Sequence, residues 1–353
     1  MFAPGKCDPL HLNFPMETER VGQALTAREI FELVREDLEC VEKAINSDSL
    51  ASVETVTAIS RYLQESGGKR LRPALLLLCA RFCGSGEVEA RRKMAIELGA
   101  VVEMIHAATL VHDDVIDVAQ TRRGRPSANV QWGNHTCVLA GDWLYTQAFQ
   151  VALRERNFHV LDLLISLTQM MVEGELIQLE RIGRMDITEA DCMELVDRKT
   201  ACLFSACAKL GAVSAGVETA VEEKLGEFAW NLGMAFQLID DLLDFTSREQ
   251  TLGKPVGGDL KEGKVTLPLV YALEKATSAE RDQVHKVLED RNYDSTSFEE
   301  IYAMVVARGG IQRSRERAQQ FTDRARQVVA EFPDSPYQRA LCMLTDLVTE
   351  RDR

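Results

Sequence analysis

The chain has 353 residues, of which 46% are hydrophobic and 27% are charged, and its formal net charge is −14 at pH 7. This composition is typical of a soluble globular protein, and the acidic balance argues against a nucleic-acid-binding surface, which needs a basic footprint. The nine cysteines include no Cys-x-x-Cys pair, so we expect neither a zinc site nor a redox site. Buried thiols in a reducing, cytoplasmic setting are the favoured interpretation.

The first residues contain no basic segment leading into an apolar core, so they do not resemble a secretory signal. We expect a loose arm over residues 1–20, followed by a single domain over residues 21–353. No window offers about 18 uncharged apolar residues, since Arg81 interrupts the apolar stretch "RPALLLLCARFC". The sequence therefore predicts no transmembrane span, and it leaves a peripheral membrane contact open.

Three long segments are apolar at nearly every position, which is typical of helices buried on most sides. They are residues 95–117, 160–180 and 222–245. Alternating strand patterns are absent, and no proline lies between Pro126 and Pro255. The C-terminal part, residues 276–353, is more polar and amphipathic, as expected of outer helices. The sequence therefore predicts an all-α fold, a single large bundle of ten or more helices.

Three loops rich in glycine and proline separate these helices, over residues 65–73, 120–134 and 251–268. Cations gathered in glycine-rich loops of an acidic protein indicate anion binding. The loops contain Lys69, Arg70, Arg72, Arg122, Arg123, Arg125, Lys254, Lys261 and Lys264.

Two helical segments carry aspartates with the same spacing, i, i+1 and i+4: Asp113, Asp114 and Asp117, and then Asp240, Asp241 and Asp244. Residues i and i+4 share a helix face, about 5–6 Å apart at Cβ, where two carboxylates repel each other unless a cation neutralises them. Mg²⁺ suits such a site, because it takes one or two carboxylates and shares phosphate oxygens with a substrate. A solvated acidic helix face is the alternative for one motif, but two copies within apolar helices argue against it. An EF-hand is excluded because the alternate ligands and central glycine are missing.

An ordered set of motifs from about residue 30 to the C-terminus resembles the trans-isoprenyl diphosphate synthases, the polyprenyl synthetase family. The motifs are "GGKRLRP", "LVHDDVIDVAQTRRGRPS", "GDWL", "GE", "KTACLF", "GMAFQLIDDLLDF" and "GKPVGGDLKEGKVTLP". Within the family, the chain looks most like the bacterial long-chain enzymes of quinone side chains, the octaprenyl diphosphate synthases. The resemblance implies long helices around a deep central cavity, with the two aspartate motifs facing each other across its mouth. It also implies a homodimer, through the apolar helices at 95–117 and 135–153.

The resemblance implies the condensation of an allylic diphosphate with successive isopentenyl diphosphates to an all-trans polyprenyl diphosphate. The resemblance implies three Mg²⁺ ions around the departing diphosphate, and Mn²⁺ is an alternative. The implied ligands are Asp113, Asp117 and Asp240. Further ligands or neighbouring carboxylates are Asp114, Asp241 and Asp244. The resemblance also implies that the positive charge beside this diphosphate comes from Arg122, Lys199, Lys254 and Lys264. Thr200 and Gln237 match positions near the developing allylic cation, and isopentenyl diphosphate is expected at Lys69, Arg72, His106 and Arg123. For His106 or Gln237 taken singly, the alternative is a structural role, as a polar residue that is hydrogen-bonded within the core.

Product length depends on the turns before Asp113, which we expect to line the tunnel for the growing chain. Short-chain members of the family carry bulky aromatics four and five residues before the first aspartate; here these positions are Thr109 and Ala108, with Ile105 one turn deeper. The next candidate floor includes the small residues Val151 and Ala152. A C35–C50 product is therefore expected, octaprenyl in particular. The alternative is that Ala108 only packs against neighbouring helices and that the floor of the tunnel lies elsewhere.

Three other functions compete with this interpretation. A geranylgeranyl or other medium-chain diphosphate synthase would differ only in product length. A class I terpene cyclase would carry Ser or Thr where Asp244 stands and would have no use for the "GGKRLRP" loop. A non-catalytic partner subunit would be expected to lose aspartates or basic residues, and none is missing here.

Overall fold

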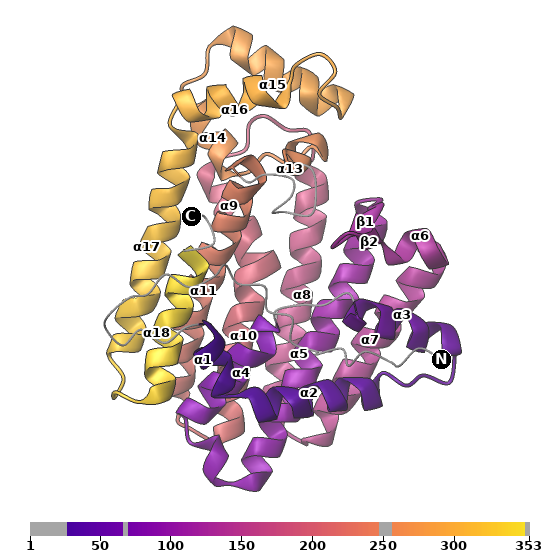
Figure 1. Ribbon diagram of the computed structural model, residues 1–353, viewed down its shortest axis with the longest axis vertical. Helices are drawn as coiled ribbons and strands as arrows, with labels where there is room; N and C mark the ends of the chain where they lie inside the picture. The colour runs from indigo at the N-terminus through magenta and orange to yellow at the C-terminus, as the bar shows by residue number, and fades with distance from the viewer. Residues whose placement is uncertain (1–26, 66–69, 247–255, 350–353) are drawn as a thin grey trace, which may run out of the picture.

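The computed structural model describes residues 27–65, 70–246 and 256–349, and these are almost entirely helical (Figure 1). The expected arm and the predicted residues Lys69 and Lys254 lie outside the described residues. In the first half of the chain the helices are α1 (Ala27–Glu32), α2 (Arg35–Asp48), α3 (Glu54–Glu65), α4 (Leu71–Phe82), a 3₁₀ turn (Ser85–Glu87), α5 (Glu89–Ile116), α6 (Ala128–Trp132), α7 (Asn134–Arg154) and α8 (Phe158–Arg181).

In the second half, α9 (Glu189–Val196) runs through a π-helical turn (Asp197–Ala201) into α10 (Cys202–Ala215). The remaining helices are α11 (Thr219–Thr246), α13 (Gly258–Lys261), α14 (Leu267–Leu273), α15 (Ser278–Asp290), α16 (Phe298–Ala307), α17 (Gly310–Ala330) and α18 (Pro336–Thr349). The predicted all-α bundle of ten or more helices is confirmed.

A single hydrophobic core runs through α4, α5, α10 and α11, the helices at the centre of Figure 1. Every residue from Pro73 to Ala80 on α4 is buried, because this helix is apolar on all sides and is enclosed by its neighbours. A smaller cluster joins α14, α15 and α16. Helices α15 and α16 lie at one end of the molecule in Figure 1, in agreement with the predicted outer position of this part, and each begins with a capping box.

By length and composition alone, α5 could cross a membrane, and no other helix of the described residues could. The most apolar window of α5 is 56% buried within the structure. It packs against α7, α2, α4 and α10. Its apolar sequence is therefore explained by its place in the core.

One short hairpin was not expected from the sequence, which shows no alternating strand pattern. The strands β1 (Thr121–Arg122) and β2 (Arg125–Pro126) are antiparallel, with Arg122 opposite Arg125. The two turn residues, Arg123 and Gly124, have φ angles of 52° and 74°. Two successive positive φ angles are the mark of a type I′ turn, which matches the twist of a hairpin. Strands of two residues are too short for alternation to reveal them.

Candidate active site

A cavity of about 730 Å³ lies between α5, α8, the π-helical turn, α11 and the segment 259–266. Its charged and polar wall contains residues from both halves of the chain: Arg72, His106, His112, Asp113, Asp117, Arg122, Glu175, Gln178, Arg181, Asp191, Lys199, Thr200, Gln237, Asp241, Asp259 and Lys264. The rest of its wall is mainly apolar and includes Leu110, Met171, Val172, Leu176 and Leu203. A cavity lined by both charged groups and hydrocarbon suits an amphipathic ligand.

The first aspartate motif divides into two kinds of side chain. Asp113 and Asp117, one helical turn apart at the end of α5, both line the cavity. Burial raises the pKa of Asp113 to about 6, because a low-dielectric site disfavours the charged form. Asp114 points elsewhere: it is 1% exposed and accepts hydrogen bonds from Arg122 at 2.7 and 2.8 Å. Asp114 therefore positions Arg122, which itself lines the cavity.

The second motif, on α11, faces the cavity through Asp241. Burial raises the pKa of Asp241 well above its usual value, and nearby Asp259 raises it further. Asp244 is 1% exposed and accepts a hydrogen bond from the backbone N–H of Asp259 at 3.2 Å. Neither Asp240 nor Asp244 is among the residues that line the cavity. The structure thus places Asp241 in the cavity wall, and the metal role predicted for Asp240 stays a prediction.

These carboxylates fit a metal ion that is shared with a substrate. Within the described residues, no group of three His, Cys, Asp or Glu side chains is arranged to hold a metal ion by itself. Asp113 and Asp117 face the cavity from α5, and Asp241 faces it from α11. Mg²⁺ is commonly bound by one or two carboxylates, water and substrate phosphate oxygens. The donor set therefore fits Mg²⁺ ions bridged by a diphosphate, and a nearby cation would also favour the ionised form of the buried carboxyls.

The π-helical turn brings two consecutive residues, Lys199 and Thr200, to the cavity wall. Such single turns are frequent at functional sites. Two glycines, which have no side chain, leave room for this π-helical turn. A Cβ at Gly233 would lie 2.7 Å from Ala201 Cα, and a Cβ at Gly174 would lie 2.9 Å from Arg198 Cβ. Replacing either glycine would therefore displace the turn that carries Lys199.

The side chains of the π-helical turn are held by hydrogen bonds to α8 and α11. Lys199 Nζ donates to Glu175 and, at 3.0 Å, to Gln178 Oε1. Thr200 Oγ1 donates to Gln237 Oε1 at 2.8 Å, and Gln237 Nε2 donates to Asp241 Oδ1 at 3.0 Å. The oxygens of Thr200 and Gln237, predicted to lie near an allylic cation, are thus linked to a cavity carboxylate. No sequence motif indicated Gln178. Glu175 belongs to the family motif "GE", but the sequence alone gave no role for it.

Lys264 brings a cation to the first aspartate motif from the opposite side. Its Nζ lies 3.3 Å from both carboxylate oxygens of Asp117. Burial lowers the pKa of Lys264, but Asp117 and Glu262 outweigh it, so the pKa is raised overall. The Lys264 side chain therefore remains charged beside the aspartates.

Three of the four residues predicted for isopentenyl diphosphate are described, and they lie together. Arg72 Nη1 is 3.1 Å from His106 Nε2, and both residues line the cavity. His106 and Arg123 also border a small adjoining recess of about 40 Å³. Burial and then Arg72 lower the pKa of His106 well below its usual value. His106 is therefore neutral at pH 7, and its ring nitrogen accepts from Arg72.

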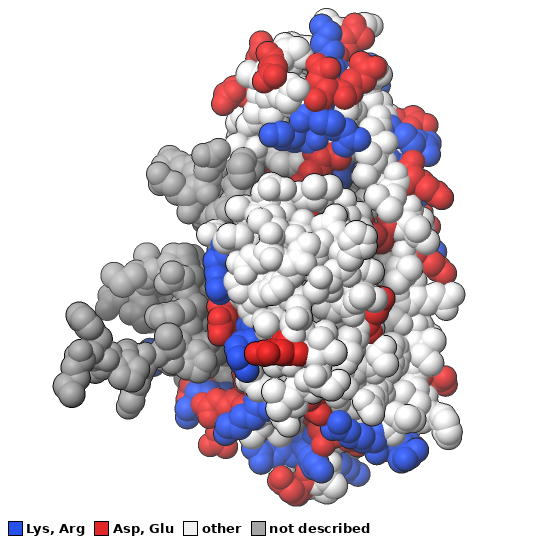
Figure 2. All heavy atoms as spheres, turned by 90° about the vertical axis from the view of Figure 1, so that its right-hand side faces the viewer, with Lys and Arg blue, Asp and Glu red and all other residues white. Residues whose placement is uncertain are grey.

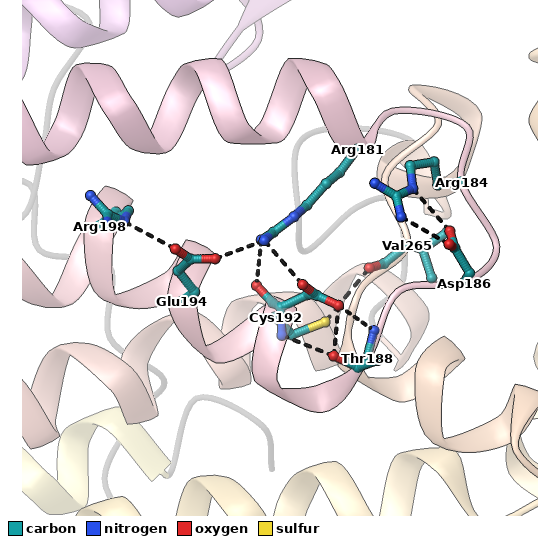
Figure 3. A network of polar contacts seen from close by, with 9 residues as sticks. Arg181, Arg184, Asp186, Thr188, Cys192, Glu194, Arg198 and Val265 are labelled. Carbon is teal, nitrogen blue, oxygen red and sulfur yellow. Dashed lines mark hydrogen bonds and ion pairs between the residues drawn. The ribbon is translucent and has the colours of Figure 1, made fainter.

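A network of ion pairs and hydrogen bonds joins α8, α9 and the π-helical turn beside the cavity (Figure 3). Arg181 donates to the backbone oxygen of Asp191 at 2.9 Å and to Glu194 Oε2 at 2.7 Å. Glu194 in turn pairs with Arg198, at 3.5 Å. Cys192 Sγ lies 3.8 Å from the carbonyl oxygen of Val265, next to Lys264. This network fixes one edge of the cavity, and no sequence motif indicated it.

The residues predicted to set product length do not all reach the cavity. Thr109 lines it, whereas Ala108, Ile105, Val151 and Ala152 are fully buried and are not part of its wall. On α5 and its C-cap, the cavity wall contains residues 106, 109, 110, 112, 113, 115, 116 and 117, and Ala108 points about 100° away from its neighbour Thr109. His112 also lines the cavity, as does Tyr145 on α7.

Tyr62 on α3 holds the hairpin that carries Arg122 and Arg123. Its hydroxyl donates to the carbonyl oxygen of Pro126 at 2.7 Å and accepts from Gln131 Nε2 at 2.9 Å. The Arg125 guanidinium lies 4.3 Å from the centre of the Tyr62 ring, which is the geometry of a cation–π contact. No motif drew attention to this tyrosine.

Tyr62→Phe is expected to weaken binding of the anion at the hairpin, because it removes the hydroxyl and keeps the ring. The loss of about one hydrogen bond corresponds to a roughly fivefold to tenfold rise in KM, for isopentenyl diphosphate through Arg123 and for the allylic substrate through Arg122. Steady-state kinetics with each substrate varied in turn would measure it. Tyr337→Phe, on α18 and away from the cavity, is the matched control, and unchanged KM values for both substrates would contradict the role of Tyr62.

Comparison with known proteins identifies the family. A family model described as polyprenyl synthetase matches residues 53–305. The chain belongs to the polyprenyl synthetase family. The enzyme is 38% identical to the all-trans-nonaprenyl-diphosphate synthase (geranyl-diphosphate specific) of Rhodobacter capsulatus, over 92% of this chain and 98% of that protein. It is 36% identical to the octaprenyl diphosphate synthase of Escherichia coli, over 93% of this chain and all of that protein.

The fold is shared with solved structures of the same family. The polyprenyl synthase from Caulobacter crescentus, complexed with calcium and isoprenyl diphosphate, has a TM-score of 0.87 and 34% identity, over 94% of this chain and all of that one. A decaprenyl diphosphate synthase from Rhodobacter capsulatus has a TM-score of 0.86 and 35% identity, over 92% of this chain and 99% of that one. These matches confirm the expected family and fold.

Proposed function

We propose that this enzyme condenses an allylic diphosphate with successive isopentenyl diphosphates and releases a long-chain, all-trans polyprenyl diphosphate of C35–C50. The observation that carries the proposal is the composition of the cavity. Asp113 and Asp117 from the end of α5 and Asp241 from α11 line it together with basic residues, and the rest of its wall is mainly apolar. The long-chain activities named for similar proteins support the product class. The octaprenyl product remains the favoured one, and a medium-chain diphosphate is the alternative.

The difficult step is the separation of a diphosphate anion from an allylic cation, and fixed charges must stabilise that anion. Asp113, Asp117 and Asp241 would hold Mg²⁺ ions, which neutralise the departing diphosphate when bound. Asp240 and Asp244 remain part of the proposed ligand set, and Asp114 acts as a neighbouring carboxylate that positions Arg122. Arg122, Lys199, Lys264 and Lys254 add positive charge. The calcium and isoprenyl diphosphate in the Caulobacter crescentus structure support a metal–diphosphate site.

The protein's own dipoles orient the second substrate and the cation. Arg72 and Arg123, with Lys69, would hold isopentenyl diphosphate, and neutral His106 would accept from Arg72 and keep its fork in place. Arg guanidinium groups suit this role because they present two donors to phosphate oxygens. Thr200 and Gln237 would direct their oxygens toward the allylic cation, as their linked positions in the wall suggest.

A direct assay tests the function. The purified chain would be incubated with farnesyl diphosphate, radiolabelled isopentenyl diphosphate and Mg²⁺. Long hydrophobic product would support the synthase. Cyclic hydrocarbon made without isopentenyl diphosphate would instead indicate a terpene cyclase, and no turnover would indicate a non-catalytic partner subunit.

The two anion pockets should respond to different substitutions. Arg72→Ala is expected to raise the KM for isopentenyl diphosphate more than that for the allylic substrate, and Arg122→Ala to do the reverse. Loss of a charged hydrogen bond costs about 1.5–3 kcal/mol, or roughly tenfold to a hundredfold. Steady-state KM values for both substrates would measure the difference, and equal changes would show that the pockets are misassigned.

The oligomeric state and location are part of the proposal. We expect a homodimer of about twice 39.4 kDa. Exposed apolar side chains on α7 and α8 support a partner surface there, and α7 is one of the two helices, 95–117 and 135–153, predicted for it. The eight cysteines in the described part of the chain are free thiols. Free thiols support a cytoplasmic location, with a peripheral membrane contact left open.

A further inference from the structure

The turn between α15 and α16, residues 291–297, lies against the segment 257–264. This segment carries three residues of the cavity wall, Asp259, Gly263 and Lys264, and its helix α13 packs against α15 (Figure 1). Neither α15 nor α16, which are described along their whole length, lines the cavity. Figure 2 shows that charged side chains gather on the outside of this end of the molecule. These two helices can therefore affect the site only indirectly, and the segment 257–264 connects them to it.

Tyr293 connects this turn to the second aspartate motif. Its hydroxyl donates to the carbonyl oxygen of Gly257 at 2.7 Å, and the N–H of Gly257 donates to the carbonyl oxygen of Asp244 at 2.9 Å. Asp244 Oδ2 in turn accepts from the N–H of Asp259 at 3.2 Å. Burial, and then Asp244 and Asp259, raise the pKa of Tyr293, so its hydroxyl keeps the proton that it donates. Tyr293 thus fixes the backbone at Gly257, on which the position of Asp259 depends.

An aromatic cluster holds Tyr293 against the end of α11. Phe245, near the end of α11, stacks with Phe298 of α16 at 6.2 Å between ring centres. Tyr293 meets Phe298 edge to face at 5.7 Å, and Tyr302 stacks with Phe298 at 6.2 Å. Such pairs contribute about 0.5–1.5 kcal/mol each beyond the burial of their surface. A Cβ at Gly257 would lie 2.6 Å from the Tyr293 hydroxyl oxygen, so the absence of a side chain there allows this close approach.

Arg291 holds the other end of the segment. Its guanidinium donates to the carbonyl oxygen of Glu262, two residues before Lys264, and a Cβ at Gly263 would lie 2.9 Å from Arg291 Nη2. The N–H of Gly183, after α8, donates to the Gly263 carbonyl oxygen at 2.9 Å. Arg291 itself has a φ of 55°, a left-handed conformation that costs about 1–2 kcal/mol for a residue with a side chain. The contacts of its guanidinium offset that cost.

We infer that Tyr293 and Arg291 are positioning residues, which clamp the two ends of the segment 257–264 and so hold Asp259 beside the second aspartate motif and Lys264 beside the first. The inference rests on the proposed synthase function and gives the outer helices α15 and α16 a part in it. The clamp acts on the residues expected to bind the allylic diphosphate and its metal ions. It does not act on isopentenyl diphosphate, whose expected residues lie on α4, α5 and the hairpin and in the segment before α4.

The first test is Tyr293→Phe, which removes the hydroxyl and keeps the aromatic cluster. In the full chain without metal or substrate, we expect the backbone amides of 257–264 to exchange with deuterium about fivefold faster, as measured by mass spectrometry. The KM for the allylic diphosphate and the Mg²⁺ concentration at half-maximal rate should rise about threefold to tenfold. The KM for isopentenyl diphosphate should stay within about twofold of wild type. Tyr302→Phe, in the same cluster, is the matched control. Unchanged exchange, or an equal rise in both KM values, would overturn the inference.

The second test, Arg291→Gly, separates positioning from stability. Glycine adopts the left-handed conformation freely, so the melting temperature should stay the same or rise, while the KM for the allylic diphosphate rises about fivefold. Arg291→Lys keeps a donor and should restore part of the loss. Arg156→Gly, at an exposed arginine after α7 with a φ of 51°, is the matched control. A lower melting temperature with wild-type kinetics would overturn the inference. Absence of condensation by the wild-type chain would instead refute the synthase function, and hydrogen exchange would still test the clamp.

Discussion

Replacing Asp113 by alanine is expected to lower kcat by about a thousandfold, since several kcal/mol of charge stabilisation depend on the metal that this residue would hold. Asp113 lies in the cavity wall, one helical turn from Asp117, and the charge of Lys199 interacts with it electrostatically. The measurement is single-turnover condensation of farnesyl and isopentenyl diphosphates with saturating Mg²⁺. Asp282→Ala, at an exposed residue of α15, is the control for the loss of one carboxylate.

Two further results would separate a metal role from a purely structural one. Excess EDTA should reproduce the loss in the wild-type enzyme, and Mg²⁺ or Mn²⁺ should restore it. Asp114→Asn should act differently, because Asp114 binds Arg122 and does not line the cavity; we expect a raised KM for the allylic substrate. Full activity in EDTA, or an Asp113→Ala enzyme as fast as wild type, would rule out the proposed metal site.

The fold could be predicted because its signals are local. Continuous apolar segments such as 222–245 leave no solvent face, so helices buried in a bundle follow directly from the sequence. The repeated spacing of the aspartates also indicated the two helices whose ends border the cavity. Both signals depend on residues close together in the chain.

The parts that could not be predicted depend on contacts between distant segments. Asp241 rather than Asp240 lines the cavity because the position of α11 against its neighbours decides which side of the motif is open. Tyr62 reaches Pro126, 64 residues away, and Lys199 reaches Glu175 and Gln178 on another helix. The rotation of α5 similarly brings Thr109 and not Ala108 to the wall, although both stand at the positions that the family resemblance implies.

Thr109→Tyr is therefore expected to shorten the product to C15–C20 while the first condensation stays nearly intact. Thr109 lies on the wall one helical turn, about 5.4 Å, before Asp113, a distance similar to one extended prenyl unit. A tyrosine there would project into the path of the growing chain, whereas the metal and diphosphate residues would be unchanged. The readout is chromatography of the dephosphorylated alcohols, with the helical circular dichroism signal confirming the fold.

Two variants show whether size at this position is the cause. Thr109→Val keeps the volume and removes only the hydroxyl, which donates to the His106 carbonyl at 2.7 Å, so the product should keep its wild-type length. Ala108→Tyr tests the position implied by the family resemblance. Ala108 is fully buried and faces away from the cavity, so a tyrosine there would overpack the core, at a typical cost of about 1–3 kcal/mol, and would lower the melting temperature. If Ala108→Tyr shortens the product and Thr109→Tyr does not, the tunnel runs on the other side of α5.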